Sequence, residues 1–205
     1  WLEGLATQKV TVIAAPRCAY THFLDDDGVL IDDMIFAVVS EEEILGVPNA
    51  SMIGVMWDWF TKHLPDDGSV QLENLSDEMS IMALQGPEAK SLLSTVLGDA
   101  NHVGRFKWQA IGENALEVSG WLQGTGYTGE AGYEIFVPNE DAPSLWRALI
   151  AAGAVPVGLG ARDTLRLEKG FLLSGVDFCW PPLAEGEDAG FLARDSWETN
   201  VPFGL

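Results

Sequence analysis

Two adjacent carboxylates, Asp32 and Asp33, stand inside an apolar run that extends from Val29 to Phe36. The run predicts a β-strand, where Asp is uncommon, because a half-buried carboxylate is costly unless it finds partners. Neighbouring residues of a strand point to opposite faces, so only one of the two can face a given pocket and exchange protons there. A charged strand that guards a sheet edge against aggregation explains the pair as well.

Arg162 and Arg166 fall on one face of a predicted helix, with Asp163 within pairing reach of Arg166. In a chain that is poor in basic residues, two neighbouring arginines are a local positive feature. They could neutralise a buried carboxylate such as Glu134, or bind an anionic or polar ligand. A purely structural ion-pair cluster is the alternative, and the pattern leaves both open.

Two familiar binding motifs occur without the neighbouring residues that their function requires. Residues 124–129 satisfy G-x-G-x-x-G, but a dinucleotide site needs a helix to open at the third glycine, and residues 133–137 predict a strand. A calcium loop around Asp25 and Asp27 would place its first acidic ligand at Phe23 and its closing Glu at Met34. A solvated acidic turn therefore explains this segment better.

The charge balance excludes several partners. The 205 residues carry 11 Lys+Arg against 31 Asp+Glu, for a formal net charge of -20. Binding to a phosphate backbone depends on many basic residues, so we expect no nucleic acid partner. The same charge disfavours an anionic membrane surface, and no apolar run approaches the roughly 18–20 residues that span a bilayer.

Metal and disulfide chemistry is also disfavoured. Cys18 and Cys179 are too few for a disulfide framework or a cysteine-based zinc site. The three histidines show no metal-ligand spacing, so we expect no metal. Reduced thiols favour a cytoplasmic location, or a mitochondrial one in a eukaryote.

The elements that must position these residues follow from local patterns. Asp25 to Gly28 separates two apolar runs and predicts a β-hairpin. Further strands are expected at 10–13, 81–84 and 133–137. Helices are expected at 51–64, 88–97, 144–152 and 159–167. Pro87 would be the first residue of the second of these helices, Asp141 would cap the third, and Gly170 would end the fourth. The hairpin favours an α+β fold of mostly antiparallel sheets with flanking helices over a doubly wound parallel sheet.

Five stretches, taken together, resemble the aminomethyltransferase family, the T-protein of the glycine cleavage system. They are residues 20–35 with Gly28-Val29-Leu30-Ile31-Asp32-Asp33, then Asn49-Ala50, Ala83-Leu84-Gln85-Gly86-Pro87, Gly126-Tyr127-Thr128-Gly129-Glu130-Ala131-Gly132-Tyr133-Glu134, and residues 158–168. The resemblance extends to about residue 178.

The resemblance implies an enzyme that takes an aminomethyl group from the lipoyl arm of the H-protein. It releases ammonia and forms 5,10-methylenetetrahydrofolate from tetrahydrofolate. By the matching motifs, Asp33 would face N10 of the folate, Glu134 and Arg162 would hold its pterin and polar parts, and Tyr20 and Tyr127 would line the pocket. Because Asp33 stands beside a second carboxylate, we expect it to hold its proton more readily than a free Asp.

The resemblance also implies an internal fragment of a larger protein. Residues 1–70 would form part of a first folate-binding subdomain without its N-terminal segment, and residues 71–178 a second α+β subdomain, with a linker near 65–75. Residues 179–205 would lead to a missing C-terminal barrel domain that contributes to the site, and residues 178–196 look like an insertion. The piece by itself is therefore expected to lack part of the site.

Three alternatives stay open. A tetrahydrofolate-dependent demethylase, or the folate domain of an N-methyl amino acid dehydrogenase, would share the pocket and use another donor. A non-catalytic folate-binding iron–sulfur assembly factor of the same superfamily would carry a Lys-Gly-Cys-Tyr motif, but in this chain Phe171 stands at the position of the cysteine. A generic acidic binding module is the least specific alternative.

Overall fold

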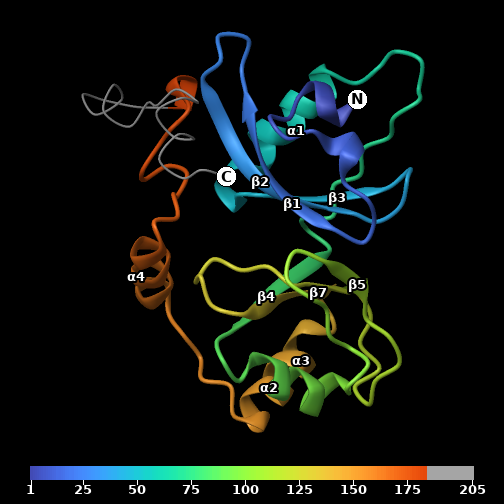
Figure 1. Ribbon diagram of the computed structural model, residues 1–205, viewed down its shortest axis with the longest axis vertical. Coiled ribbons are helices and arrows are strands. Elements are labelled where there is room, and N and C mark those ends of the chain that lie inside the picture. Colours follow the sequence, from blue (N-terminus) through green and yellow to red (C-terminus); the bar gives the residue numbers. More distant parts are fainter. Residues whose placement is uncertain (184–205) are drawn as a thin grey trace. The chain divides into compact units, whose positions relative to one another are not determined.

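The computed structural model describes residues 1–183, and its contacts divide the chain into two compact units (Figure 1). Among the described residues, the first unit contains 1–15, 19–74 and 172–183, and the second contains 16–18 and 75–171. Each combines antiparallel strands with helices, which confirms the predicted α+β class. The division into 1–70, 71–178 and 179–205 stays a prediction, and most of its third part, like most of the insertion 178–196, lies outside the described residues.

The sheet of the first unit has the order β1-β2-β3, with strands Cys18–Leu24, Leu30–Val38 and Ile44–Pro48. A turn from Asp25 joins β1 to β2, and the Asp25 Oδ1 accepts the N–H groups of Asp27 at 3.0 Å and Val29 at 2.9 Å. Gly28 has a φ of +80°, a conformation that glycine adopts without strain. The hairpin predicted around Asp-Gly is therefore confirmed.

Helix α1, Ile53–Lys62, follows a 3-10 turn at Ala50–Met52 and confirms the helix predicted at 51–64. Its apolar face joins the core of the first unit with side chains from β1 and β2. The buried members of this core are Val10, Ala19, Phe23, Ile31, Met34, Phe36, Val38, Met52 and Met56.

The strand predicted at 10–13 is wrong, because Val10–Val12 form a 3-10 turn. The N–H of Ile13 donates to the carbonyl of Val10 at 3.0 Å, so this segment bonds to itself. β-Branched residues favour a strand only where a pleated neighbour can pair with them, and that tertiary context overrides their propensity here. A second short 3-10 turn covers Leu2–Gly4.

The sheet of the second unit has the order β4-β7-β6-β5, with antiparallel pairing throughout. Its strands are Met79–Gln85 for β4, Trp108–Ala110 for β5, Trp121–Gln123 for β6 and Gly132–Pro138 for β7. The strands predicted at 81–84 and 133–137 are confirmed, and β7 lies between β4 and β6.

Helices α2, Ala89–Leu97, and α3, Ala142–Ala152, cover one face of this sheet (Figure 1). Alternate residues of β7, at Tyr133, Ile135 and Val137, enter the core beneath these helices. Because side chains of a strand alternate, Glu134 points to the opposite face.

Two helix starts differ from the sequence patterns. Pro87 lies before the cap of α2, whose first residue is Ala89, because the N–H of Ala89 already bonds the carbonyl of Gly86 in a turn at 3.0 Å. Asp141 is the N-cap residue of α3, but its side chain makes no capping bond and instead accepts the N–H of Ser119 at 3.2 Å. Helix α4, Leu159–Lys169, ends at Gly170 with a φ of +75°, which confirms that helix and its stop.

A last 3-10 turn covers Pro181–Leu183. Among the described residues 1–183, none of the helices combines the length and the apolar character needed to cross a membrane.

Candidate functional site

The carboxylate pair lies on β2, the middle strand of its sheet, so the edge-strand interpretation is wrong. Asp32 is fully buried and Asp33 is partly buried. The register pairs Met34 with Pro48, which brings the next residue, Asn49, beside the pair. The Asn49 Nδ2 donates to Oδ1 of Asp32 at 2.8 Å and to Oδ1 of Asp33 at 2.6 Å.

A second donor reaches Asp33 from the neighbouring strand. The hydroxyl of Tyr20, on β1, donates to Oδ2 of Asp33, and the Tyr20 ring meets His22 edge-on with centroids 4.8 Å apart. Burial lowers the pKa of His22, and the nearby Asp33 carboxylate opposes that shift. Both oxygens of Asp33 thus accept a hydrogen bond, which fixes the orientation of a carboxylate that can accept a proton.

Asp32, the buried member of the pair, has a raised pKa. Burial raises the pKa of Asp32 from 3.8 to about 7, while the hydrogen bonds from Asn49 act in the opposite direction and the Asp33 charge adds to the rise. The raised pKa of Asp32 was not expected from the sequence, and the expectation for Asp33 stays a prediction. Of the two strand faces, the one that carries Asp32 is closed to solvent, and desolvation disfavours the charged form.

In the second unit, Glu134 of β7 accepts the hydroxyl of Thr125 at 2.5 Å. Burial raises the pKa of Glu134, whereas the Thr125 bond and the positive charge of Arg162 act to lower it. Arg162 thus favours the charged form of Glu134, but the effect of burial is larger.

Arg162 belongs to α4, where its guanidinium carbon lies 4.5 Å from the centroid of the Tyr127 ring. Tyr127 also stacks on Phe171, with ring centroids 5.8 Å apart. A cation over an aromatic face is attracted by the ring quadrupole, so the exposed Arg162 is held beside Tyr127. Two flat rings and one cation therefore lie together in this unit.

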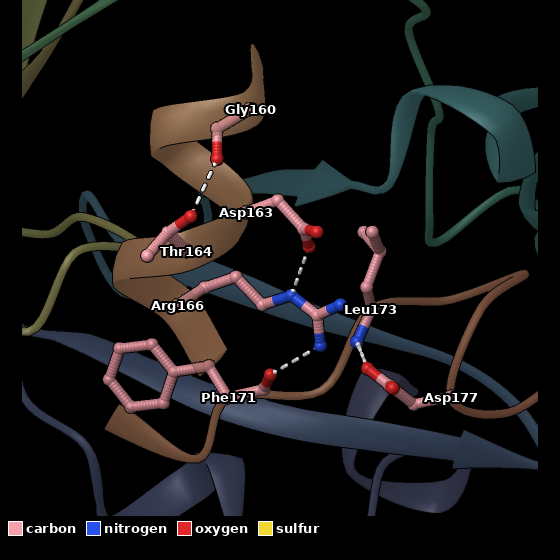
Figure 2. Close-up of polar contacts among 7 residues, drawn as sticks. All are labelled: Gly160, Asp163, Thr164, Arg166, Phe171, Leu173 and Asp177. Atoms are coloured by element: carbon pink, nitrogen blue, oxygen red, sulfur yellow. Dashed lines mark hydrogen bonds and ion pairs between the residues drawn. The ribbon is translucent and has the colours of Figure 1, made fainter. Parts of the chain in front are cut away.

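The second arginine of α4 has a structural role. Arg166 is 2% exposed; its Nε donates to Asp163 at 2.7 Å and its Nη1 to the carbonyl of Phe171 at 3.0 Å (Figure 2). The predicted pairing of Asp163 with Arg166 is confirmed. The structural ion-pair explanation thus applies to Arg166, which closes the C-terminal end of the helix.

The Gly-rich segment is a loop between β6 and β7, two paired strands, so the exclusion of a dinucleotide helix is confirmed. The Gln85 Nε2 donates to the carbonyls of Thr125 and Tyr133, each at 3.1 Å. A Cβ on Gly126 would lie 2.1 Å from Gln85 Oε1, and one on Gly132 would lie 2.6 Å from Gln85 Cδ. The absence of a Cβ at these two glycines therefore leaves room for Gln85, whose side chain holds both ends of the loop.

One side chain near Glu134 stands out for its lack of partners. Gln123 pairs with Glu134 in the register of β6 and β7 and is fully buried. Within residues 1–183, neither amide atom of Gln123 has a hydrogen-bond partner.

The structure brings the predicted site residues into two groups, which lie in different units. Tyr20 and Asp33 are bonded in the first unit, and Glu134, Tyr127 and Arg162 gather in the second. Their roles in binding and catalysis stay predictions. In the described part of the chain, no three His, Cys, Asp or Glu side chains form a group that could hold a metal ion.

Sequence reasoning did not identify several polar partners of these residues. Asn49 and Gln85 entered only as parts of similar stretches, and Thr125 was not singled out. Asn49 could have been identified from its position, because it directly follows a strand that pairs with the strand of Asp32 and Asp33.

The comparisons with known proteins agree with the resemblance. A family model described as the GCVT N-terminal domain matches residues 1–179. A curated aminomethyltransferase of Chloroherpeton thalassium is 41% identical over 183 residues, covering 85% of this chain and 49% of that protein. One of Prosthecochloris aestuarii is 36% identical over 210 residues, covering 100% of this chain and 56% of that protein. The chain spans about half the length of the curated relatives it matches.

A solved structure extends the agreement to the fold. The glycine cleavage system aminomethyltransferase T of Bartonella henselae matches with a TM-score of 0.70 and 26% identity, over 85% of this chain and 46% of that one. The predicted resemblance is thereby confirmed, and the chain belongs to the family of the GCVT N-terminal domain.

Proposed function

We propose that the complete protein is a tetrahydrofolate-dependent aminomethyltransferase of glycine cleavage. It takes the aminomethyl group from the lipoyl arm of an H-protein, releases ammonia and forms 5,10-methylenetetrahydrofolate. The observation that carries the proposal is the carboxylate of Asp33, held through both of its oxygens by Tyr20 and Asn49. The family membership of residues 1–179 supports it.

In this reaction the methylene carbon leaves the sulfur and the nitrogen of the donor and bonds N5 and N10 of the folate. The two folate nitrogens lose their protons, one of which ends on the lipoyl thiol and the other on ammonia. Asp33 would position N10 and accept its proton as that nitrogen attacks the iminium carbon. A carboxylate whose orientation is already fixed meets the geometric requirement of a general base.

Glu134, Tyr127 and Arg162 would bind the folate. A carboxylate accepts hydrogen bonds from the amino and ring N–H groups of a pterin, and aromatic rings give flat apolar walls. Folate is an anion and the chain has a net charge of -20. Its binding must therefore depend on a few local cations, of which Arg162 is the candidate that lies beside an aromatic ring.

The test is made on the complete protein. Calorimetry with tetrahydrofolate should show binding at a single site, and an aminomethyl-lipoyl H-protein should release ammonia only when tetrahydrofolate is present. Transfer from an N-methylated small molecule without H-protein would replace the proposal by a demethylase or a dehydrogenase folate domain. Folate binding without any transfer would favour the assembly-factor alternative, and absence of folate binding would contradict the whole proposal.

We also propose a cytoplasmic location, or a mitochondrial one in a eukaryote. The two cysteines, Cys18 and Cys179, are both free, which is the usual state of thiols in a reducing compartment.

A further inference from the structure

One amide group connects the two carboxylates of β2. The Asn49 Nδ2 carries two protons, and it lies 2.8 Å from Oδ1 of Asp32 and 2.6 Å from Oδ1 of Asp33. It also lies 3.3 Å from the backbone carbonyl of Asp33. The amide therefore uses its full donor capacity on these two residues.

The orientation of this amide is determined by Asp32. Both oxygens of Asp32 accept from Asn49, Oδ1 from the side chain and Oδ2 from the backbone N–H at 3.3 Å. A flipped amide would turn its carbonyl oxygen toward Oδ1 of Asp33 and lose the donor bonds to both residues. Asp32 is closed to solvent and therefore cannot exchange these bonds for bonds to water.

We propose that Asp32 and Asn49 are positioning residues: the buried Asp32 fixes the Asn49 amide, and Asn49 in turn fixes the carboxylate of Asp33 in its reactive orientation. This inference rests on the proposed function, because it gives Asp33 its catalytic role. Tyr20 holds the second oxygen of Asp33, so loss of Asn49 leaves the carboxylate attached at one oxygen and free to turn about its own bonds.

The expected signature is a loss of rate with little loss of binding. A displacement of about 1 Å in a reacting group can cost on the order of 100-fold in rate. In the complete protein, Asn49→Ala should lower kcat about 10- to 100-fold and change the calorimetric Kd for tetrahydrofolate by less than about threefold. Asn49→Ser, which keeps one donor, should fall between Asn49→Ala and the wild type and serves if the alanine variant folds poorly.

Asn101 offers a matched control. It is 1% exposed; its Nδ2 donates to the carbonyl of Leu97 at 2.6 Å and its Oδ1 accepts the N–H of Gly112 at 2.6 Å. Asn101→Ala should lower the melting temperature as a buried hydrogen-bonded asparagine does, while kcat per folded molecule stays at the wild-type value.

A second readout needs no folate. The titratable side chains of Tyr20 and His22 on β1 interact with Asp33, and β3 carries no titratable residue between Ile44 and Pro48. Carbon-13 NMR of labelled aspartate carboxyls should give a midpoint of about 7 for Asp32 in the wild type. The Asn49 bonds favour the charged form, so Asn49→Ala should move that midpoint upward, and Asn101→Ala should not.

The two experiments separate the two proposals. A wild-type protein without tetrahydrofolate-dependent transfer contradicts the proposed function, and with it the catalytic meaning of Asn49. If transfer is present but Asn49→Ala keeps the wild-type kcat, the positioning role is overturned and the proposed function stands. An unchanged Asp32 midpoint in Asn49→Ala also overturns the positioning role, because it removes the contact on which that role depends.

Discussion

The carboxylate pair on β2 and the group of side chains around Glu134 of β7 differ in how many of their polar atoms have a hydrogen-bond partner. Both oxygens of Asp32 and both oxygens of Asp33 accept hydrogen bonds. Around β7, by contrast, the amide of the buried Gln123 and the Nε1 of Trp121 have no hydrogen-bond partner among the described residues. One cluster is a closed network, and the other is incomplete.

A buried polar group without a hydrogen-bond partner lowers the free energy of unfolding by about 1–3 kcal/mol, and the atoms of Gln123 and Trp121 carry this cost whereas those of Asp32 and Asp33 do not. Under the proposed function, this difference has a simple meaning. The carboxylate that must act on a reacting atom is held at both of its oxygens, whereas the sheet face that carries Glu134 keeps an amide, that of Gln123, without a bond inside residues 1–183. The difference predicts that changes in the first unit affect rate and that changes in the second affect affinity.

The largest expected effect is that of Asp33→Asn, which preserves shape and removes the base. Loss of a general base typically costs about 10²–10⁴-fold in rate, so kcat should fall by that order while the Kd for tetrahydrofolate changes by less than about threefold. Steady-state kinetics and calorimetry on the complete protein give the two numbers. Asp58→Asn, an exposed change on α1, is the control, and equal turnover in Asp33→Asn and wild type would remove Asp33 from the mechanism.

Asp32→Asn tests the buried member of the same cluster through stability. The pKa of Asp32 rises from 3.8 to about 7 on folding, so between these values the folded protein retains a proton that the unfolded chain has lost. Stability of the wild type therefore falls as pH rises through this window, and the variant escapes that fall. As pH rises from 3.8 to about 7, the unfolding free energy of the variant should increase relative to that of the wild type by about 1.4 kcal/mol per pH unit, roughly 4 kcal/mol in total.

Urea unfolding of the complete protein between about pH 4 and pH 8 measures that difference. A difference that levels off above the pKa of Asp32 supports the assignment. A difference that stays constant over the whole range would show that Asp32 titrates alike in the folded and unfolded states.

The smallest expected effect is that of Arg162→Ala in the second cluster. Removing the cation beside Tyr127 should weaken tetrahydrofolate binding about tenfold, equivalent to about 1.4 kcal/mol, and leave kcat at saturating folate within about threefold. Arg147→Ala, on the exposed side of α3, removes the same charge elsewhere and should leave the calorimetric Kd unchanged. A larger effect on kcat than on Kd would erase the proposed contrast between the two units.

Local signals predicted much of the fold. The Asp-Gly turn, the strand that carries Asp32 and Asp33, and the stop of α4 at Gly170 each depend on residues that are close in the chain. Propensity failed at residues 10–13, where strand formation requires a partner strand that no local pattern can reveal.

The site was predicted less completely, for the same reason. Asn49 meets Asp33 only through the register between β2 and β3, which the turn at residues 39–43 fixes, and the sequence patterns predicted neither β3 nor that turn. Alternation on a strand indicated that Asp32 and Asp33 face opposite sides, but it could not tell which side is closed to solvent. The sequence therefore did not indicate that burial raises the pKa of Asp32.

The position of Gln85 has a consequence for the evolution and engineering of this chain. One side chain, Gln85, donates to Thr125 near the start of the 124–131 loop and to Tyr133 just beyond its end, so its loss would release both ends of the loop at once. Substitution at Gly126 or Gly132 would displace the same side chain. Gln85, Gly126 and Gly132 therefore act as one unit, and a substitution at either glycine should disturb both ends of the loop.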